Sequence, residues 1–199
     1  MAFLLSGLLS GPTLAQAAPN DNVPSNVPLA AINRALQNLP PQSGRFQQIL
    51  PNGTQITGEY HMDWPQRVRF SYDGGGAVIT VKDGFIAVQD TPRAEPNWVP
   101  VSLTPLALIR RAIAQGISAA MLVEAEAGDA FWALTLRDPS GDTPGQATLF
   151  FTKAETTLYA WRLIDVQNLV TQLRLSGIRP QTNLDPALFH IDYDDEEDE

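Results

Sequence analysis

The chain has 199 residues with 13 basic and 22 acidic side chains. This length suits one domain, and the net charge of −9 argues against a surface that follows nucleic-acid phosphates. The absence of cysteine excludes disulfides, thiolate zinc sites and cysteine nucleophiles, and two histidines are too few for a histidine-rich metal centre, so we expect neither metal nor cofactor.

The N-terminal segment has the features of an export signal. Residues 2–9 form an apolar run far shorter than the roughly 20 residues that a membrane-spanning helix needs. Ala15-Gln16-Ala17 then provides the small-x-small pattern of a signal peptidase site. We therefore predict a signal peptide over 1–17, a proline- and asparagine-rich linker over 18–28, and an exported, soluble protein that is not membrane-embedded.

A helix and then a run of strands are expected next. Leu29, Ile32, Leu36 and Leu39 recur at helical spacing, and Pro40 ends the predicted helix. The following segment predicts an antiparallel meander with strands over 45–50, 56–64, 67–72, 77–81 and 85–88.

A second helix follows, and then strands return. Thr104 is expected to cap this helix, Pro105 suits its first position, and Gly116 can end it. The later strands are expected over 120–126, 131–137, 147–152, 158–165 and 169–175. Two helices among about ten or eleven antiparallel strands predict a mainly β (α+β) fold with a sheet curved around the helices, rather than a parallel βαβ fold.

The C-terminus is strongly acidic. Seven of the 22 acidic residues lie within 192–199, which leaves 15 acidic against 13 basic residues in the rest of the chain. We interpret 192–199 as a disordered, solubilising tail, and docking to a basic partner is the alternative.

Catalytic patterns are sparse, and no catalytic residue is predicted. His61 with Asp63, and Glu124 with Glu126, are pairs two residues apart that would each share a strand face, and solvated strand faces explain both. The chain has no Gly-x-Ser-x-Gly motif, and Gly74–Gly76 lacks the Lys-Ser/Thr of a phosphate loop. An exported hydrolase that depends on His61 or Glu124 stays open as an alternative.

Five segments, in order along the chain, resemble the LolA family of periplasmic lipoprotein carriers. Their residues are Gly44-Arg45-Phe46-Gln47-Gln48, the run from Gly58-Glu59-Tyr60 through Trp64-Pro65 to Phe70, Ile79-Thr80-Val81-Lys82-Asp83-Gly84, Thr104-Pro105-Leu106, and Trp161-Arg162-Leu163-Ile164-Asp165 with Leu184-Asp185-Pro186-Ala187-Leu188-Phe189. The resemblance covers 29–191, which we take as the carrier domain.

The resemblance implies an incomplete antiparallel β-barrel whose open side is covered by helices. It also implies a hydrophobic cavity for lipoprotein acyl chains, an ATP-driven inner-membrane transporter as donor, an outer-membrane receptor if one exists, and a monomer. A lipid- or lipoprotein-sensing module with the same fold is the alternative.

The same resemblance suggests residues for the cavity and for its helical lid. The cavity candidates are Val68, Phe70, Tyr72, Leu106, Ile109, Phe46, Met62, Phe131 and Trp161, all of which could equally be ordinary core residues. The lid-associated candidates are Trp64, Arg67 and Arg69. Trp64 stands where the family has an arginine, so we expect apolar contact rather than a charge-assisted hydrogen bond to hold the lid.

Overall fold

The computed structural model describes residues 26–193, so the predicted signal peptide, most of the linker and residues 194–199 lie outside it. Eleven strands form one antiparallel sheet in the order β6-β5-β4-β3-β2-β1-β11-β10-β9-β8-β7. Their bounds are β1 (Gln42–Ile49), β2 (Gln55–Asp63), β3 (Arg67–Tyr72), β4 (Val78–Lys82), β5 (Phe85–Gln89), β6 (Asn97–Pro100), β7 (Leu122–Ala127), β8 (Phe131–Leu136), β9 (Gln146–Thr152), β10 (Leu158–Ile164) and β11 (Val170–Pro180).

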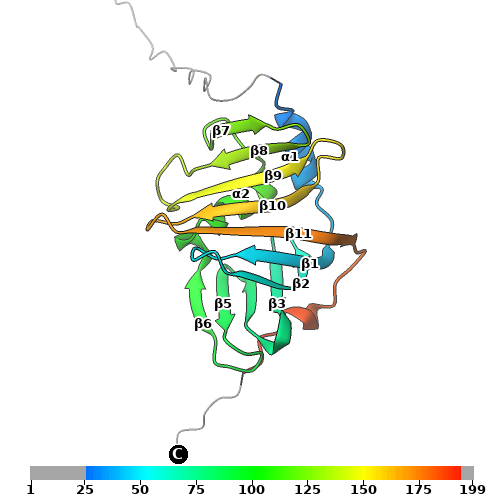
Figure 1. Ribbon diagram of the computed structural model, residues 1–199, viewed down its shortest axis with the longest axis vertical. Coiled ribbons are helices and arrows are strands. Elements are labelled where there is room, and N and C mark those ends of the chain that lie inside the picture. Colours follow the sequence, from blue (N-terminus) through cyan, green and yellow to red (C-terminus); the bar gives the residue numbers. More distant parts are fainter. Residues whose placement is uncertain (1–25, 194–199) are drawn as a thin grey trace, which may run out of the picture.

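The sheet is curled but does not close. In Figure 1, β7 to β10 run across the view, whereas β3 to β6 run at a steep angle to them. The first and last strands of the order, β6 and β7, do not pair with each other, so the predicted incomplete barrel is confirmed. Sequence analysis missed β6, a four-residue edge strand that ends in Pro100, because proline weakens a strand pattern yet is tolerated at a sheet edge.

Two short helices, α1 (Leu29–Gln37) and α2 (Leu106–Gln115), pack against one face of the sheet, which we call the inner face. Their buried residues, Ile32 and Leu36 in α1 and Leu108, Ile109, Ala112 and Ile113 in α2, form one apolar stripe on each helix. No helix within residues 26–193 is long and apolar enough to cross a bilayer.

The ends of α2 confirm one capping prediction and contradict another. Gly116 follows α2 with a φ of 84°, a conformation that suits glycine, as predicted. Thr104 does not cap the helix with its side chain, because its hydroxyl donates instead to the carbonyl of Val101 at 2.9 Å. That hydrogen bond fixes the tight turn that leads into Pro105.

Glycines in β1 and β2 make room for aromatic rings on the inner face. Phe46 pairs with Gly58, and Tyr60 pairs with Gly44, across the two strands. A Cβ atom on Gly58 would lie 2.6 Å from the Phe46 ring, and one on Gly44 would lie 2.9 Å from the Tyr60 ring. Each ring therefore lies over the glycine opposite it.

The C-terminal segment covers part of the opposite, outer face. A short 3-10 helix, η3 (Pro186–Phe189), packs beside β3, and Phe189 is 2% exposed. Beyond it, Gln89 on β5 donates from Nε2 to the carbonyl of Asp192 at 2.8 Å. Strands β3 to β5 are thus packed on both faces.

Candidate binding site

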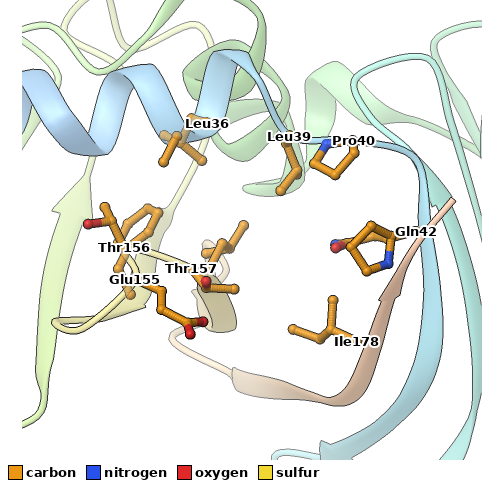
Figure 2. A pocket seen from close by; sticks show the side chains of 12 residues that line it. Leu36, Leu39, Pro40, Gln42, Glu155, Thr156, Thr157 and Ile178 are labelled. Carbon is orange, nitrogen blue, oxygen red and sulfur yellow. The ribbon is translucent and has the colours of Figure 1, made fainter. Parts of the chain in front are cut away.

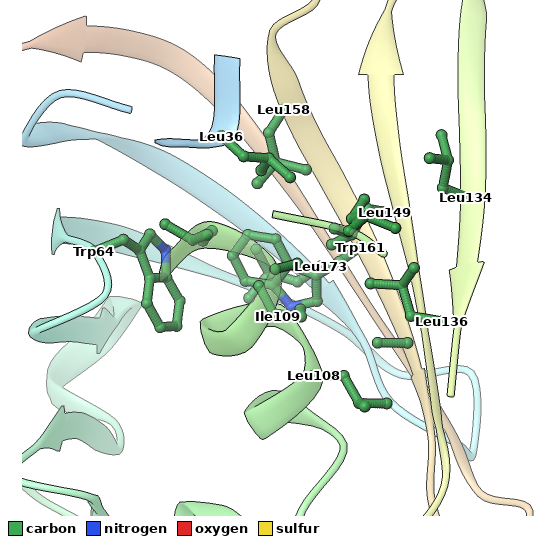
Figure 3. Close-up of a cluster of buried hydrophobic side chains, with 14 of the residues drawn as sticks. Leu36, Trp64, Leu108, Ile109, Leu134, Leu136, Leu149, Leu158, Trp161 and Leu173 are labelled. Atoms are coloured by element: carbon green, nitrogen blue, oxygen red, sulfur yellow. The ribbon is translucent and has the colours of Figure 1, made fainter. Parts of the chain in front are cut away.

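The inner face carries a continuous set of buried apolar side chains between the sheet and the two helices, which we call the inner cluster. Figure 3 shows Leu36 of α1 beside Leu158 of the sheet, and Ile109 of α2 beside Trp161 and Leu173. Six of the predicted cavity residues lie in the inner cluster, namely Phe46, Met62, Val68, Phe70, Ile109 and Trp161. Tyr72 and Leu106 are half-buried and pack against it.

Aromatic rings from three strands, β1, β3 and β10, meet at the inner cluster. Phe46 contacts Phe70 at a centroid distance of 5.1 Å and Tyr72 at 5.0 Å, both edge to face. Phe70 also contacts Trp161 at 6.3 Å. Strand β3 therefore presents Phe70 and Tyr72 to the same side, as the alternation in its sequence predicts.

Phe131 lies apart from the other predicted cavity residues. Its ring contacts Phe150 at a centroid distance of 6.2 Å, and neither residue belongs to the inner cluster. The next residue of β8, Trp132, packs against the cluster instead. Since neighbouring residues of a strand point to opposite faces, Phe131 lies on the outer face.

Two polar atoms within the inner cluster have no hydrogen-bond partner among residues 26–193, the hydroxyl of Tyr60 and Nε1 of Trp64. A buried, unpaired group of this kind costs about 1–3 kcal/mol. Burial raises the pKa of Tyr60 to about 12, so its hydroxyl stays protonated. Tyr72 differs, because its hydroxyl donates to Oε1 of Gln48.

A cavity of about 200 Å³ opens beside the end of α1, next to the inner cluster. Figure 2 shows Leu36 and Leu39 on one side of it and Gln42 and Ile178 on the other. The remaining lining residues are Ala35, Pro40, Phe151, Glu155, Thr156, Thr157, Leu158 and Pro180. Pockets for small ligands usually hold about 300–1,000 Å³, so this cavity is smaller than such a pocket. The residues of the inner cluster are at most 6% exposed, so the cluster itself is closed in this structure.

The two helices are joined to each other by a reciprocal pair of hydrogen bonds. Asn33 of α1 donates from Nδ2 to the carbonyl of Ile117 at 3.0 Å, and its Oδ1 accepts from the Ile117 amide at 2.7 Å. We call α1 and α2 together the lid, since this pair and their apolar contacts join them into one cover over the inner cluster.

Charged side chains of α2 connect the lid to the sheet. Arg110 donates from Nε to the carbonyl of Pro65, in the β2–β3 turn, at 3.0 Å. Arg111 donates to the buried carboxylate of Asp138, after β8, at 2.8 Å. The expectation that only apolar contact holds the lid is therefore wrong: Trp64 is buried as expected, but the adjacent Pro65 accepts a charge-assisted hydrogen bond from the helix.

The family model described as "Outer membrane lipoprotein carrier protein LolA" matches residues 38–192. The chain belongs to the LolA family. The match contains all eleven strands and α2, and it confirms the resemblance that the five sequence segments indicate.

Solved structures with a similar arrangement share little sequence with this LolA-family chain. A putative outer-membrane lipoprotein-sorting protein domain from Vibrio parahaemolyticus has a TM-score of 0.49 and 9% identity, with 81% of this chain and 94% of that chain covered. An uncharacterized conserved protein from Thermus thermophilus has a TM-score of 0.47 and 12% identity, with coverage of 82% and 96%. A LolA-superfamily protein from Nitrosomonas europaea has a TM-score of 0.44 and 13% identity, with coverage of 81% and 97%. Comparison with curated protein sequences gave no match.

Arg67 and Arg69, predicted as lid-associated, face away from the lid in this LolA-family structure. The guanidinium of Arg67 lies 4.6 Å from the centre of the Phe189 ring, and Arg69 donates from Nη1 to the carbonyl of His190 at 3.2 Å. Both side chains therefore hold the C-terminal segment on the outer face. Sequence analysis missed Arg110, although its position on the polar side of α2 was visible.

The residues considered for catalysis are separated from the inner cluster. Asp63 accepts a hydrogen bond from Nε of Arg67 at 3.1 Å, and burial lowers the pKa of the neighbouring His61. Glu124 and Glu126 are exposed on the edge strand β7. Within residues 26–193 no three His, Asp or Glu side chains are grouped as a metal site would need. The LolA family is a binding and carrier family, and nothing in this arrangement indicates catalysis.

Proposed function

We propose that this chain is a periplasmic carrier that shields lipoprotein acyl chains between the lid and the inner face of the sheet. The observation that supports this function best is the inner cluster itself, an apolar surface from both halves of an open sheet that, within residues 26–193, two short helices cover. The family match adds that the fold is one used for lipoprotein transport.

The free energy of acyl chains in water explains why such a carrier needs a closed apolar surface. At roughly 0.8 kcal/mol for each buried CH₂, the transfer of a 16-carbon chain from an apolar surface into water costs on the order of 12 kcal/mol of free energy. Release of such a chain into the periplasm would be extremely slow. The carrier must therefore cover the chain and pass it directly to an acceptor.

Binding requires the lid to move, since the side chains of the lid fill the inner face in the closed structure. Asp138 accepts hydrogen bonds from Arg111, from the Thr143 amide at 2.8 Å and from the Ser140 hydroxyl at 3.0 Å, so this attachment is strong. The hydrogen bond from Arg110 to Pro65 is single. We therefore place the hinge of the lid near Asp138 and its latch at Arg110, which opens when acyl chains enter.

In this proposal the chain is exported by its signal peptide and acts as a monomer. It receives lipoproteins from an ATP-driven transporter in the inner membrane and delivers them to the outer membrane, through a receptor if one exists. Which lipoproteins it carries is a matter for direct isolation.

The test is affinity isolation of the chain from periplasm, followed by mass spectrometry of what remains bound. We expect diacylated or triacylated peptides, and we expect a purified diacylated lipopeptide to displace a hydrophobic dye. Acylated ligand that stays bound when the transporter and an outer-membrane acceptor are supplied would favour a sensing module. Turnover of ester or glycan substrates that depends on His61 or Glu124 would favour a hydrolase and contradict the carrier.

A further inference from the structure

The Tyr60 hydroxyl is a polar group within the apolar inner cluster, where a phenylalanine would provide the same apolar contact. Tyr60 is 0% exposed, its ring lies over Gly44, and its neighbour on β3 is Phe70. No residue within 26–193 accepts its hydrogen bond. A phenylalanine would fill almost the same space without leaving a polar atom unpaired.

A second unpaired donor belongs to the same inner cluster and lies just beyond the end of β2. Trp64 is 6% exposed, and its Nε1, which can only donate, has no acceptor within the described part of the chain. Two unpaired donors in one apolar cluster indicate that the missing group is an acceptor brought by a ligand.

The charges around Tyr60 limit what this acceptor can be. Arg67 and Arg69 face the outer side, where they hold the C-terminal segment. Among residues 26–193 the one buried charged side chain is Asp138, which is already paired with Arg111. Arg110 of the lid is the remaining cation on the inner side, and in the closed structure it donates to the Pro65 carbonyl, beyond the end of β2. A carboxylate beside Tyr60 would have to take Arg110 from that acceptor, whereas a neutral carbonyl oxygen needs no cationic partner.

We infer that the Tyr60 hydroxyl donates a hydrogen bond to the carbonyl oxygen of an ester- or amide-linked acyl chain bound against the inner cluster. The inference rests on the proposed carrier function and adds a chemical specificity to it. The site then prefers acyl chains with a neutral carbonyl over alkyl ethers of the same length and over free fatty acids. Tyr60 is thus a specificity residue for the linkage, since apolar contact alone cannot tell an ester from an ether of the same chain length.

The experiment compares two soluble, fluorescently labelled lipopeptides that differ only in their linkage, one with two ester-linked chains and one with two ether-linked chains. Dissociation constants are measured for the wild type, for Tyr60→Phe and for the control Tyr72→Phe. The control is matched because the Tyr72 hydroxyl lies beside the same cluster but already has Gln48 as its acceptor.

We expect Tyr60→Phe to weaken binding of the ester lipopeptide by about three- to tenfold and to leave the ether lipopeptide unchanged. Tyr72→Phe should leave the ratio of the two dissociation constants as in the wild type. Infrared spectroscopy of a bound ester with ¹³C-labelled carbonyls provides a second measurement: its carbonyl stretch should lie lower in the wild type than in Tyr60→Phe.

The outcomes separate this inference from the carrier function on which it rests. If the wild type binds both lipopeptides and Tyr60→Phe changes neither the ratio nor the carbonyl stretch, the inference is overturned and the carrier stands. If the wild type binds neither lipopeptide, both the carrier function and the inference are overturned.

Discussion

At the scale of single residues, the closed inner face depends on glycines that sit under aromatic rings. A Cβ on Gly58 would lie 2.2 Å from the carbonyl oxygen of Ser71 and 2.6 Å from the ring of Phe46. The backbone of β3 and the Phe46 ring, which is packed against Phe70 and Tyr72, cannot move away from this Cβ without loss of packing. Both strands have a glycine two residues before an aromatic residue, which is visible in the sequence. The strand register was needed to show which ring covers which glycine.

We therefore predict that Gly58→Ala lowers the free energy of unfolding by about 1–3 kcal/mol, the usual cost of overpacking a filled core. Gly76→Ala is the control, because a Cβ there would meet its nearest atoms at ordinary distances of 3.4 and 3.5 Å. Denaturant unfolding of both variants measures the difference. Equal stabilities would mean that β2 and β3 can separate at no cost, against the packing described here.

Val68 gives the second prediction at this scale, since it is 0% exposed in the inner cluster. A carboxylate there has neither water nor a partner while the lid is closed, so Val68→Glu should cost more than about 3 kcal/mol. Ser71→Glu on the other face of β3 should change stability by less than about 1 kcal/mol. A Val68→Glu protein of near-native stability that has lost lipopeptide binding would instead show that water reaches this face.

At the scale of elements, the sequence predicted most strands to within a few residues, because alternation and turn residues act locally. The strand over 67–72 was predicted with its observed bounds. The site was less accessible to prediction. The register of β8 with β9 decides that Phe131, and not Trp132, faces outward. The hydrogen bond from Arg110 to the Pro65 carbonyl likewise joins segments that lie far apart in the sequence.

The proposed latch predicts that Arg110→Ala eases opening of the lid. The variant loses the hydrogen bond from Nε to the Pro65 carbonyl, a charge-assisted bond whose removal costs about 1.5–3 kcal/mol when it is buried and less at this half-buried position. Uptake of a hydrophobic dye should become faster, as stopped-flow fluorescence would show. Arg34→Ala, an exposed arginine of α1, is the control. If both variants take up dye at the wild-type rate, Arg110 has no part in gating.

The proposed hinge at Asp138 predicts how the free energy of unfolding depends on pH in the acid range. Hydrogen bonds from Arg111 and from the Thr143 amide hold the pKa of Asp138 well below its ordinary value. A carboxylate with a lowered pKa stabilises the fold above its ordinary pKa, near 4, and loses that contribution as pH falls toward the lower value. Asp138→Asn should therefore be less stable than the wild type at pH 5–7, with a gap that shrinks below about pH 4. Unfolding free energies measured from pH 7 to pH 3 test this, and a gap independent of pH would contradict it.

At the scale of the whole molecule, the two faces of the sheet have separate covers, and this separates stability from binding. The lid covers the inner face, where the proposed ligand lies, while the C-terminal segment covers the outer face of β3 to β5 through Phe189 and its neighbours.

Phe189→Ala removes a ring that is 2% exposed and packed under Arg67, so we predict a loss of about 3 kcal/mol or more in stability. Tyr193→Ala, at a residue 43% exposed, should change stability little. Because neither residue contacts the inner cluster, the folded Phe189→Ala protein should bind the diacylated lipopeptide as the wild type does. Denaturant unfolding and lipopeptide titration on the same samples check both parts, and lost binding at unchanged stability would mean that the C-terminal segment takes part in holding the ligand.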